Sequence, residues 1–187
     1  PEPIVPGVDL FRSTDRALVD AAGPISVYLL RLDPKRVTIA SGLSNGTVMD
    51  VERVDGIAAR YEAIAAVNAG FFNVKNGEPI GLLKVAGELV SDTGLTRGVV
   101  AIKAPPGAAP ELAFDQVAVR MTLRFKAGGG DHNVPIDGVD TTRERGKLML
   151  YTPSYHPDTD TAPTGTEFVL SGGPLRVTEV RPSLGRT

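Results

Sequence analysis

Asn68, Gly70, Phe72 and Asn73 make up the local pattern in this sequence that is best suited to holding a ligand. They follow a nearly continuous apolar stretch, so two amides, a glycine and an aromatic ring come together where a buried strand would end. Amide groups pair with hydroxyls, and aromatic faces cover the apolar face of a sugar ring. The pattern therefore suits a sugar-sized ligand. The alternative, a core strand in which Phe72 packs and Asn68 caps a turn, stays open.

Three arginines, Arg97, Arg143 and Arg145, could supply the positive charge that a phosphate group needs. A guanidinium group donates two parallel hydrogen bonds to a pair of phosphate oxygens, which matches arginine to this anion. Each arginine could equally be a surface cation that pairs with a carboxylate such as Glu144. We therefore treat the three as candidates for substrate binding, with both interpretations open.

Other kinds of site find less support in the sequence. The absence of cysteine excludes disulfides, thiolate metal sites and a cysteine nucleophile. The two histidines, His132 and His156, lie far apart in polar segments, so we predict solvated loop residues and no metal site. Asp131, Asp158 and Asp160 do not have the regular spacing of a calcium loop. A nucleophile elbow, a P-loop and a dinucleotide fingerprint are all missing, and the sequence leaves the cofactor unknown.

The composition indicates a globular protein with many turns. The 187 residues include 42% hydrophobic and 22% charged residues, which excludes wholesale disorder. Glycine (21) and proline (15) are frequent and punctuate short elements. The net charge of −2 and the lack of basic runs argue against a nucleic-acid partner. The apolar stretches are shorter than the roughly 20 residues of a transmembrane helix, so no transmembrane segment is expected.

One helix is expected, over about residues 48–63. Thr47 and Asp50 have the spacing of a capping box, and Val51, Val54 and Ile57 begin an apolar stripe at spacings of three. The following run, residues 63–72, is nearly all apolar and predicts a central strand in which Ile64 and Val67 are fully buried.

The rest of the chain predicts strands and turns. Residues 26–33 and 36–41 should form a hairpin, as should the pairs 80–85 with 88–90, 98–103 with 111–114, and 167–170 with 175–180. Residues 117–125 alternate like a half-buried strand, residues 126–138 are expected to be irregular, and residues 147–151 form a short strand before a polar loop over 152–166. The fold class predicted is α+β, a mainly antiparallel sheet with one principal helix packed on it.

Two blocks of the sequence are similar to one known family. Residues 65–73 (AAVNAGFFN) and 76–81 (NGEPIG), followed by Gly87 and Arg97, resemble the NGGFF and G-x-P-x-G segment of the phosphodiester glycosidase family. Residues 136–153 (IDGVDTTRERGKLMLYTP) are similar to a second block of its bacterial members. The motifs occur in the family's order over most of the chain.

The resemblance implies a hydrolase that acts on a sugar-phosphate diester or an exopolysaccharide-related substrate. Asp140, at a position where family members often have Asn, becomes the catalytic candidate. The candidates for substrate binding are Asn68, Gly70, Phe72, Asn73, Arg97, Arg143 and Arg145. The implied partner is a carbohydrate or sugar phosphate. The implied location is secreted, periplasmic or in the cell envelope, with a signal peptide removed.

The resemblance also has a gap. The family carries a late Asp-Gly-Gly-Gly-Ser block, which this sequence does not contain before Thr187. We therefore expect residues 1–187 to be a single domain that lacks its C-terminal part, which a second chain could complete. The alternative function is a non-catalytic polysaccharide-binding or structural module of the cell envelope with the same fold, and whether the chain is an enzyme stays open.

Overall fold

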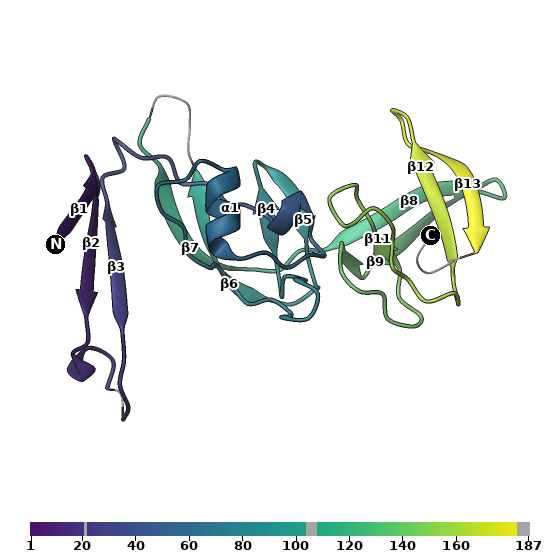
Figure 1. Cartoon of the computed structure of the whole chain (residues 1–187). Helices are drawn as coiled ribbons and strands as arrows, with labels where there is room; N and C mark the ends of the chain where they lie inside the picture. Colours follow the sequence, from purple (N-terminus) through teal and green to yellow (C-terminus); the bar gives the residue numbers. More distant parts are fainter. Residues whose placement is uncertain (21, 104–107, 183–187) are drawn as a thin grey trace. The chain divides into compact units, whose positions relative to one another are not determined.

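A computed structural model describes residues 1–20, 22–103 and 108–182 of the protein. Short strands, nearly all paired antiparallel, and one short helix account for its regular structure (Figure 1). The predicted α+β class with mainly antiparallel pairing is confirmed. The strands are divided among several small sheets, and the chain forms two compact units. Whether residues 1–187 fold as a single domain stays a prediction.

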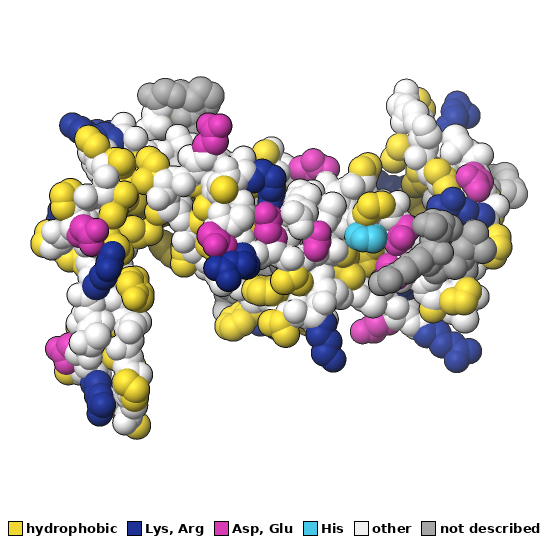
Figure 2. All heavy atoms as spheres, viewed as in Figure 1, with side chains coloured by type: hydrophobic (Ala, Val, Ile, Leu, Met, Phe, Trp, Pro, Cys, Tyr) yellow, Lys and Arg dark blue, Asp and Glu magenta, His cyan; other side chains and the backbone are white. Residues whose placement is uncertain are grey.

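The first unit comprises Pro1–Ala40 and Val100–Asp115. Its three-stranded antiparallel sheet has the order β1 (Glu2–Val5), β2 (Val8–Ser13), β3 (Val27–Leu32), with the 3-10 turn η1 (Arg16–Leu18) before β3. Figure 2 shows hydrophobic side chains exposed over this sheet. Tyr28, Leu29 and Leu32 of β3 are exposed to solvent.

The predicted pairing of residues 26–33 with 36–41 is wrong, because β3 pairs with β2 instead. The turn after β3 directs the chain away from that sheet. Asp33 accepts hydrogen bonds from the backbone N–H of Lys35 at its Oδ1 and of Arg36 at its carbonyl, while its own N–H donates to Gly7. Residues 37–40 consequently continue without strand structure.

The strands β6 (Arg97–Lys103) and β7 (Glu111–Val117) pair with each other, as predicted for residues 98–103 and 111–114. Most of both strands belongs to the first unit. Residues 104–107 of the predicted turn lie outside the described residues.

The second unit comprises Ser41–Val99 and Gln116–Thr187 and contains the helix. Its elements are the 3-10 turn η2 (Ser44–Gly46), α1 (Val54–Arg60), the hairpin of β4 (Leu83–Val85) and β5 (Glu88–Ser91), the hairpin of β8 (Met121–Ala127) and β9 (Gly130–Ile136), the parallel pair β10 (Gly138–Val139) and β11 (Met149–Leu150), and the hairpin of β12 (Thr166–Ser171) and β13 (Arg176–Pro182). The predicted hairpins at 80–90 and 167–180 are confirmed.

The helix is shorter than predicted, since it begins at Val54 and not at residue 48. The backbone N–H groups before the helix bond to a distant segment instead. Val48 N donates to Ser154 O (2.8 Å) and Met49 N donates to Tyr155 O (3.0 Å). The predicted capping box does not form, because Arg53 is the residue that precedes the first helical turn. Tertiary hydrogen bonds to residues 154–155 thus override the helical pattern in residues 48–53.

The prediction of irregular structure for residues 126–138 is also wrong, because β8 and β9 form a hairpin in register from Met121↔Ile136 to Ala127↔Gly130. Gly128 (φ +57°) and Gly129 (φ +82°) supply the two left-handed residues that a tight hairpin turn requires. The glycine run at residues 128–130 therefore contains the turn that joins the two strands.

Residues 63–72 do not form the predicted central strand. Ile64 is 58% exposed and Val67 is 78% exposed. An apolar run becomes a buried strand only when other strands cover it, and no strand of the described residues pairs with residues 63–70. The prediction of full burial for Ile64 and Val67 is therefore wrong.

We expect Val67→Ala to change the free energy of unfolding by less than about 0.5 kcal/mol, because substitutions at exposed positions remove little burial. Chemical denaturation of the two proteins measures this difference. A loss of about 1–3 kcal/mol, the cost of truncating a buried side chain, would show that Val67 is covered in solution.

The core of the second unit is small. Val48, Val90 and Tyr155 are almost completely buried and contact one another, and Tyr151 packs against this cluster with its ring centroid 4.7 Å from that of Tyr155. Their segments, before α1, in β5 and in the loop after β11, are therefore held together by this cluster.

Candidate functional site

The first family-like block ends in a closed loop over residues 71–80. Ile80 N donates to Phe71 O and Asn73 N donates to Glu78 O, both at 2.8 Å. The Asn73 side chain holds the loop from within, since its Oδ1 accepts from Lys75 N at 3.1 Å. Gly77, with φ +82°, completes the turn. Asn73 was proposed from the sequence to bind substrate, and in the structure its side chain forms a hydrogen bond within the loop.

The other predicted residues of this block are exposed. Asn68 and Gly70 lie in the extended stretch before the loop, and Gly70 has φ +67°. Phe72 is 39% exposed and forms an isolated bridge with Pro79. Among the described residues, no hydrogen bond joins Asn68 to Arg143 or Arg145. The assignment of Asn68 and Phe72 to a sugar site stays a prediction.

In the second block, Asp140 lies directly after β10 and is completely buried. Its Oδ1 accepts from Thr152 N at 2.7 Å and its Oδ2 accepts from Thr152 Oγ1 at 2.5 Å. Burial raises the pKa of Asp140 from 3.8 to about 6, and the charge of Glu88 adds to the rise, while the bonds from Thr152 oppose it. Asp140 is therefore a buried carboxyl group with a pKa well above the usual value for aspartate.

Glu78 connects the two blocks. One carboxylate oxygen accepts hydrogen bonds from Thr141 Oγ1 and from Thr142 N (2.8 Å), and the other accepts from Thr142 Oγ1 at 2.9 Å. Thr141 and Thr142 directly follow Asp140. The two family-like blocks therefore contact each other through Glu78, which was not among the candidate site residues.

Buried polar groups continue from this junction into β5. Asp92 pairs with Val139 through two backbone hydrogen bonds of 3.0 Å, and burial raises the pKa of its carboxyl group. The hydroxyls of Ser91 and Thr93 on either side are buried without a hydrogen-bond partner in the described structure. The contact between β5 and β10 therefore contains buried polar side chains beside the buried valines Val90 and Val139.

The three predicted arginines lie in different surroundings. Arg143 is half-buried, and its Nη2 donates to Ala162 O at 3.1 Å and to Thr164 Oγ1 at 3.4 Å. Its Nε is buried without a partner in the described structure. Arg145 and Arg97 are exposed, and Arg97 lies beside Gly81. Arg143 thus holds the polar loop before β12, whereas the other two are open to solvent.

A polar cavity of about 260 Å³ lies beside the 71–80 loop. It is lined by Met49, Asp50, Val51, Lys75, Asn76, His156 and Asp160. The three segments that supply these residues meet through backbone contacts. Gly77 lies so close to the strand-like segment before α1 that an added Cβ would be 1.7 Å from Asp50 O.

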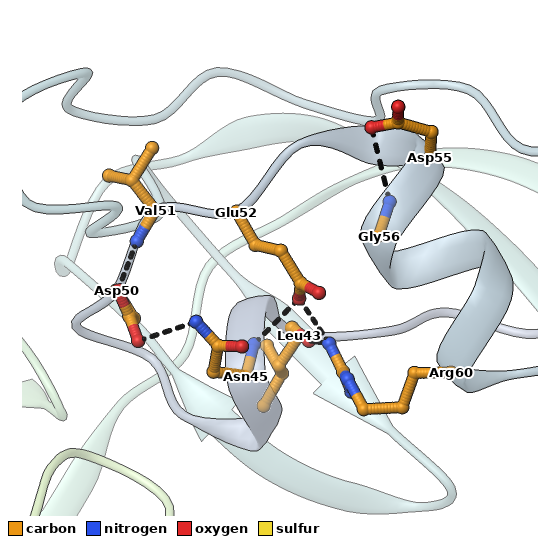
Figure 3. Close-up of polar contacts among 8 residues, drawn as sticks. All are labelled: Leu43, Asn45, Asp50, Val51, Glu52, Asp55, Gly56 and Arg60. Atoms are coloured by element: carbon orange, nitrogen blue, oxygen red, sulfur yellow. Dashed lines mark hydrogen bonds and ion pairs between the residues drawn. The ribbon is translucent and has the colours of Figure 1, made fainter.

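The acidic side of this cavity is held by short-range hydrogen bonds. Asp50 Oδ2 accepts from Asn45 Nδ2 (2.9 Å) and Oδ1 accepts from Val51 N (2.7 Å), as Figure 3 shows. These bonds, the Asn45 amide first, lower the pKa of Asp50, with a further contribution from His156. Glu52 accepts from Asn45 N, which ties the same segment to the start of α1. Asp50 is therefore a fixed, negatively charged carboxylate.

On the opposite side of the cavity, His156 Nδ1 lies 3.2 Å from Asp158 Oδ1. The same carboxylate oxygen accepts from Asp160 N at 2.9 Å. The sequence predicts solvated loop histidines, and the contact of His156 with Asp158 was not expected from it. The sequence did show His156, Asp158 and Asp160 at alternate positions of one loop, next to the core residue Tyr155. It could not show that residues 49–51 and 75–76 line the same cavity, because those residues are far away in the chain.

A second, larger cavity of about 540 Å³ lies between α1 and residues 63–66. Alanines and Ile64 form much of its lining, and its charged residues Arg53 and Asp55 pair with each other at 3.0 Å. It offers no polar side chain aimed at a ligand beyond this pair. We therefore take the smaller polar cavity as the candidate site.

Two further observations bear on the site. Among the described residues, no group of three or more His, Cys, Asp or Glu side chains is arranged to hold a metal ion. No helix of the described part of the chain is long and apolar enough to cross a membrane.

Comparison with models of known protein families, with curated proteins and with solved structures finds no match for this chain.

Proposed function

We propose that the protein is a phosphodiester glycosidase-like hydrolase that acts on a sugar-phosphate diester or an exopolysaccharide-related substrate. The proposal starts from the resemblance of residues 65–81 and 136–153 to that family. In the reaction, water adds to the anomeric carbon, the bond from that carbon to the phosphate oxygen breaks, and the phosphate leaves with the bonding electrons. Asp140 is the proposed general acid or base, and Arg97, Arg143 and Arg145 are proposed to bind the substrate.

The observation that carries the proposal is the bonding of Glu78 to Thr141 and Thr142. It joins the two family-like blocks, which are far apart in the sequence, beside a carboxyl group with a raised pKa. General acid–base catalysis is most efficient when the pKa of the group lies near the working pH. The pKa of Asp140 at about 6 is close to that condition.

The second candidate is a non-catalytic polysaccharide-binding or structural module of the cell envelope. The complete burial of Asp140 favours it, since both carboxylate oxygens accept hydrogen bonds from Thr152 and stabilise the turn. A carboxyl group in this arrangement contributes to the fold without reaching a ligand. For both candidates, the proposed location is secreted, periplasmic or in the envelope, and the proposed partner is a carbohydrate.

Hydrolysis of a methyl diester of glucose 1-phosphate, followed by release of reducing sugar, tests the proposal. We expect turnover by the chain and a loss in kcat/KM of about tenfold or more in Glu78→Gln, because an amide cannot accept all three hydrogen bonds. Glu62→Gln, at an exposed carboxylate after α1, is the matched control and should retain the activity. Binding of the diester without any release of reducing sugar would reject the hydrolase and support the binding module.

A further inference from the structure

We propose that the polar cavity beside the 71–80 loop binds one phosphorylated sugar unit. In this assignment Asp50 and Asn76 bind the ring hydroxyls, and Lys75 and His156 face the phosphate. This inference rests on the proposed function for its substrate class, and it adds a binding site whose residues differ from those that the resemblance implied.

The geometry of the cavity is set by the fold of the second unit. Residues 48–49 donate backbone hydrogen bonds to residues 154–155, which brings the Asp50 and His156 segments together. The 71–80 loop closes the third side, because Gly77 packs directly against the Asp50 carbonyl. Each wall is therefore fixed by backbone contacts next to the core residues Val48 and Tyr155. A site of this kind needs little reorganisation when a ligand binds.

Free hydrogen-bonding capacity faces the cavity. Asp50 uses one acceptor position on each oxygen, for Val51 N and Asn45 Nδ2, whereas a carboxylate offers about four. Asn76 Oδ1 accepts from Glu78 N at 3.2 Å, which leaves its two N–H donors without a partner in the described structure. A fixed acceptor beside a fixed donor matches neighbouring hydroxyls of a sugar ring, since each hydroxyl both donates and accepts.

The charges indicate where a phosphate would lie. Asp50 and Asp160 would repel an anion that is placed deep between them. Lys75 is exposed on the loop and forms no ion pair within the described residues, and the imidazole of His156 is oriented by Asp158. A sugar ring inside the cavity, with its phosphate beside Lys75 and His156, keeps the phosphate away from the carboxylates of Asp50 and Asp160. The ligand class that follows is a glycosyl phosphate.

The size of the cavity limits the ligand to one sugar unit. Its volume of about 260 Å³ is just below the range of roughly 300–1,000 Å³ that is usual for sites of drug-sized ligands. A longer saccharide would have to extend out of the cavity.

Titration calorimetry with glucose 1-phosphate and with methyl glucoside tests the assignment in the full chain. We expect the phosphate ester to bind more tightly and Lys75→Met to weaken its binding about fivefold, with no effect on the glucoside. Lys84→Met, at an exposed lysine of β4, is the matched control and should bind both probes as the unchanged chain does. Asp50→Asn should weaken the binding of both probes about tenfold, because a ring hydroxyl of the ligand would lose the carboxylate oxygen that accepts its hydrogen bond.

Histidine ring signals in NMR spectra locate the site independently of these variants. The chain has two histidines, and His132→Gln assigns them without touching the cavity. We expect glucose 1-phosphate to shift the His156 signals and to leave those of His132 unchanged. Binding that leaves His156 unshifted, or that is lost in Asp55→Asn at the larger cavity, would overturn the assignment, as would the absence of binding of either probe at millimolar concentration.

These outcomes are separable from those of the hydrolysis test. Turnover that does not depend on Lys75 or Asp50 would retain the proposed hydrolase and overturn the cavity as its binding site. Lys75-dependent binding of glucose 1-phosphate without turnover would support the cavity and reject the hydrolase.

Discussion

Gly77→Ala is expected to lower the free energy of unfolding by about 2–5 kcal/mol. Two effects add. Gly77 has φ +82°, a conformation that costs an L-residue about 1–2 kcal/mol. The new Cβ would also lie 1.7 Å from Asp50 O and 2.6 Å from Asp50 C, and a backbone carbonyl cannot rotate away as a flexible side chain can. The 71–80 loop would have to separate from the segment before α1.

Chemical denaturation measures this loss, and Gly87→Ala is the matched control. Gly87 has φ +87° in the turn between β4 and β5, but no atom lies within 4 Å of its added Cβ. Gly87→Ala should therefore cost only the conformational part, about 1–2 kcal/mol. Equal losses in the two variants would show that Gly77 does not pack against Asp50 in solution. Because this contact forms one wall of the polar cavity, Gly77→Ala should also weaken binding of glucose 1-phosphate.

Asp140 is expected to make the protein less stable as the pH rises through about 6. Burial raises its pKa in the folded state to about 6 from 3.8, so the folded protein binds more protons than the unfolded chain between these values. Stability then falls as the pH rises across this window, and the full difference is on the order of 3 kcal/mol. Asp92, whose pKa is also raised by burial, acts in the same direction.

Comparison with Asp140→Asn isolates this contribution. The amide keeps the size of the side chain and carries no charge, so the variant should be more stable than the unchanged protein above pH about 6 and similar to it below pH about 4. Urea denaturation at a series of pH values measures both curves. Asp131→Asn, at an exposed carboxylate of β9, should leave the curve unchanged. Parallel curves for the unchanged protein and Asp140→Asn would show that Asp140 is hydrated in the folded state.

The hairpins were predictable because their information is local. The β4–β5 hairpin needs a turn at Ala86 and Gly87, both of which have positive φ, and alternating apolar residues on each side. The β8–β9 hairpin could have been predicted by the same rule, since Gly128 and Gly129 are the residues that a two-residue turn requires. The expectation of irregular structure over residues 126–138 missed a strand of seven residues.

The exposure of residues 63–72, which were expected to form a central strand, was not predictable in the same way. Its apolar side chains are compatible with burial, but burial requires other strands on both sides, and the sequence of the run contains no information on its partners. Val67, at 78% exposure, is the clearest case. The start of α1 is similar, because hydrogen bonds from residues 48–49 to residues 154–155 replace the first predicted turn of the helix.

Residue types and their spacing were enough to predict the β-rich class and the hairpins at residues 80–90 and 167–180. Contacts between distant segments bring Glu78 to Thr141 and Thr142, bury Asp140 against Thr152, and place Asp50, Lys75 and His156 around one cavity. The two groups of features differ in how far apart in the sequence the residues that determine them lie. Turn conformations depend on neighbouring residues and can be inferred from residue types, whereas burial, a raised pKa and a shared cavity depend on contacts between segments far apart in the chain.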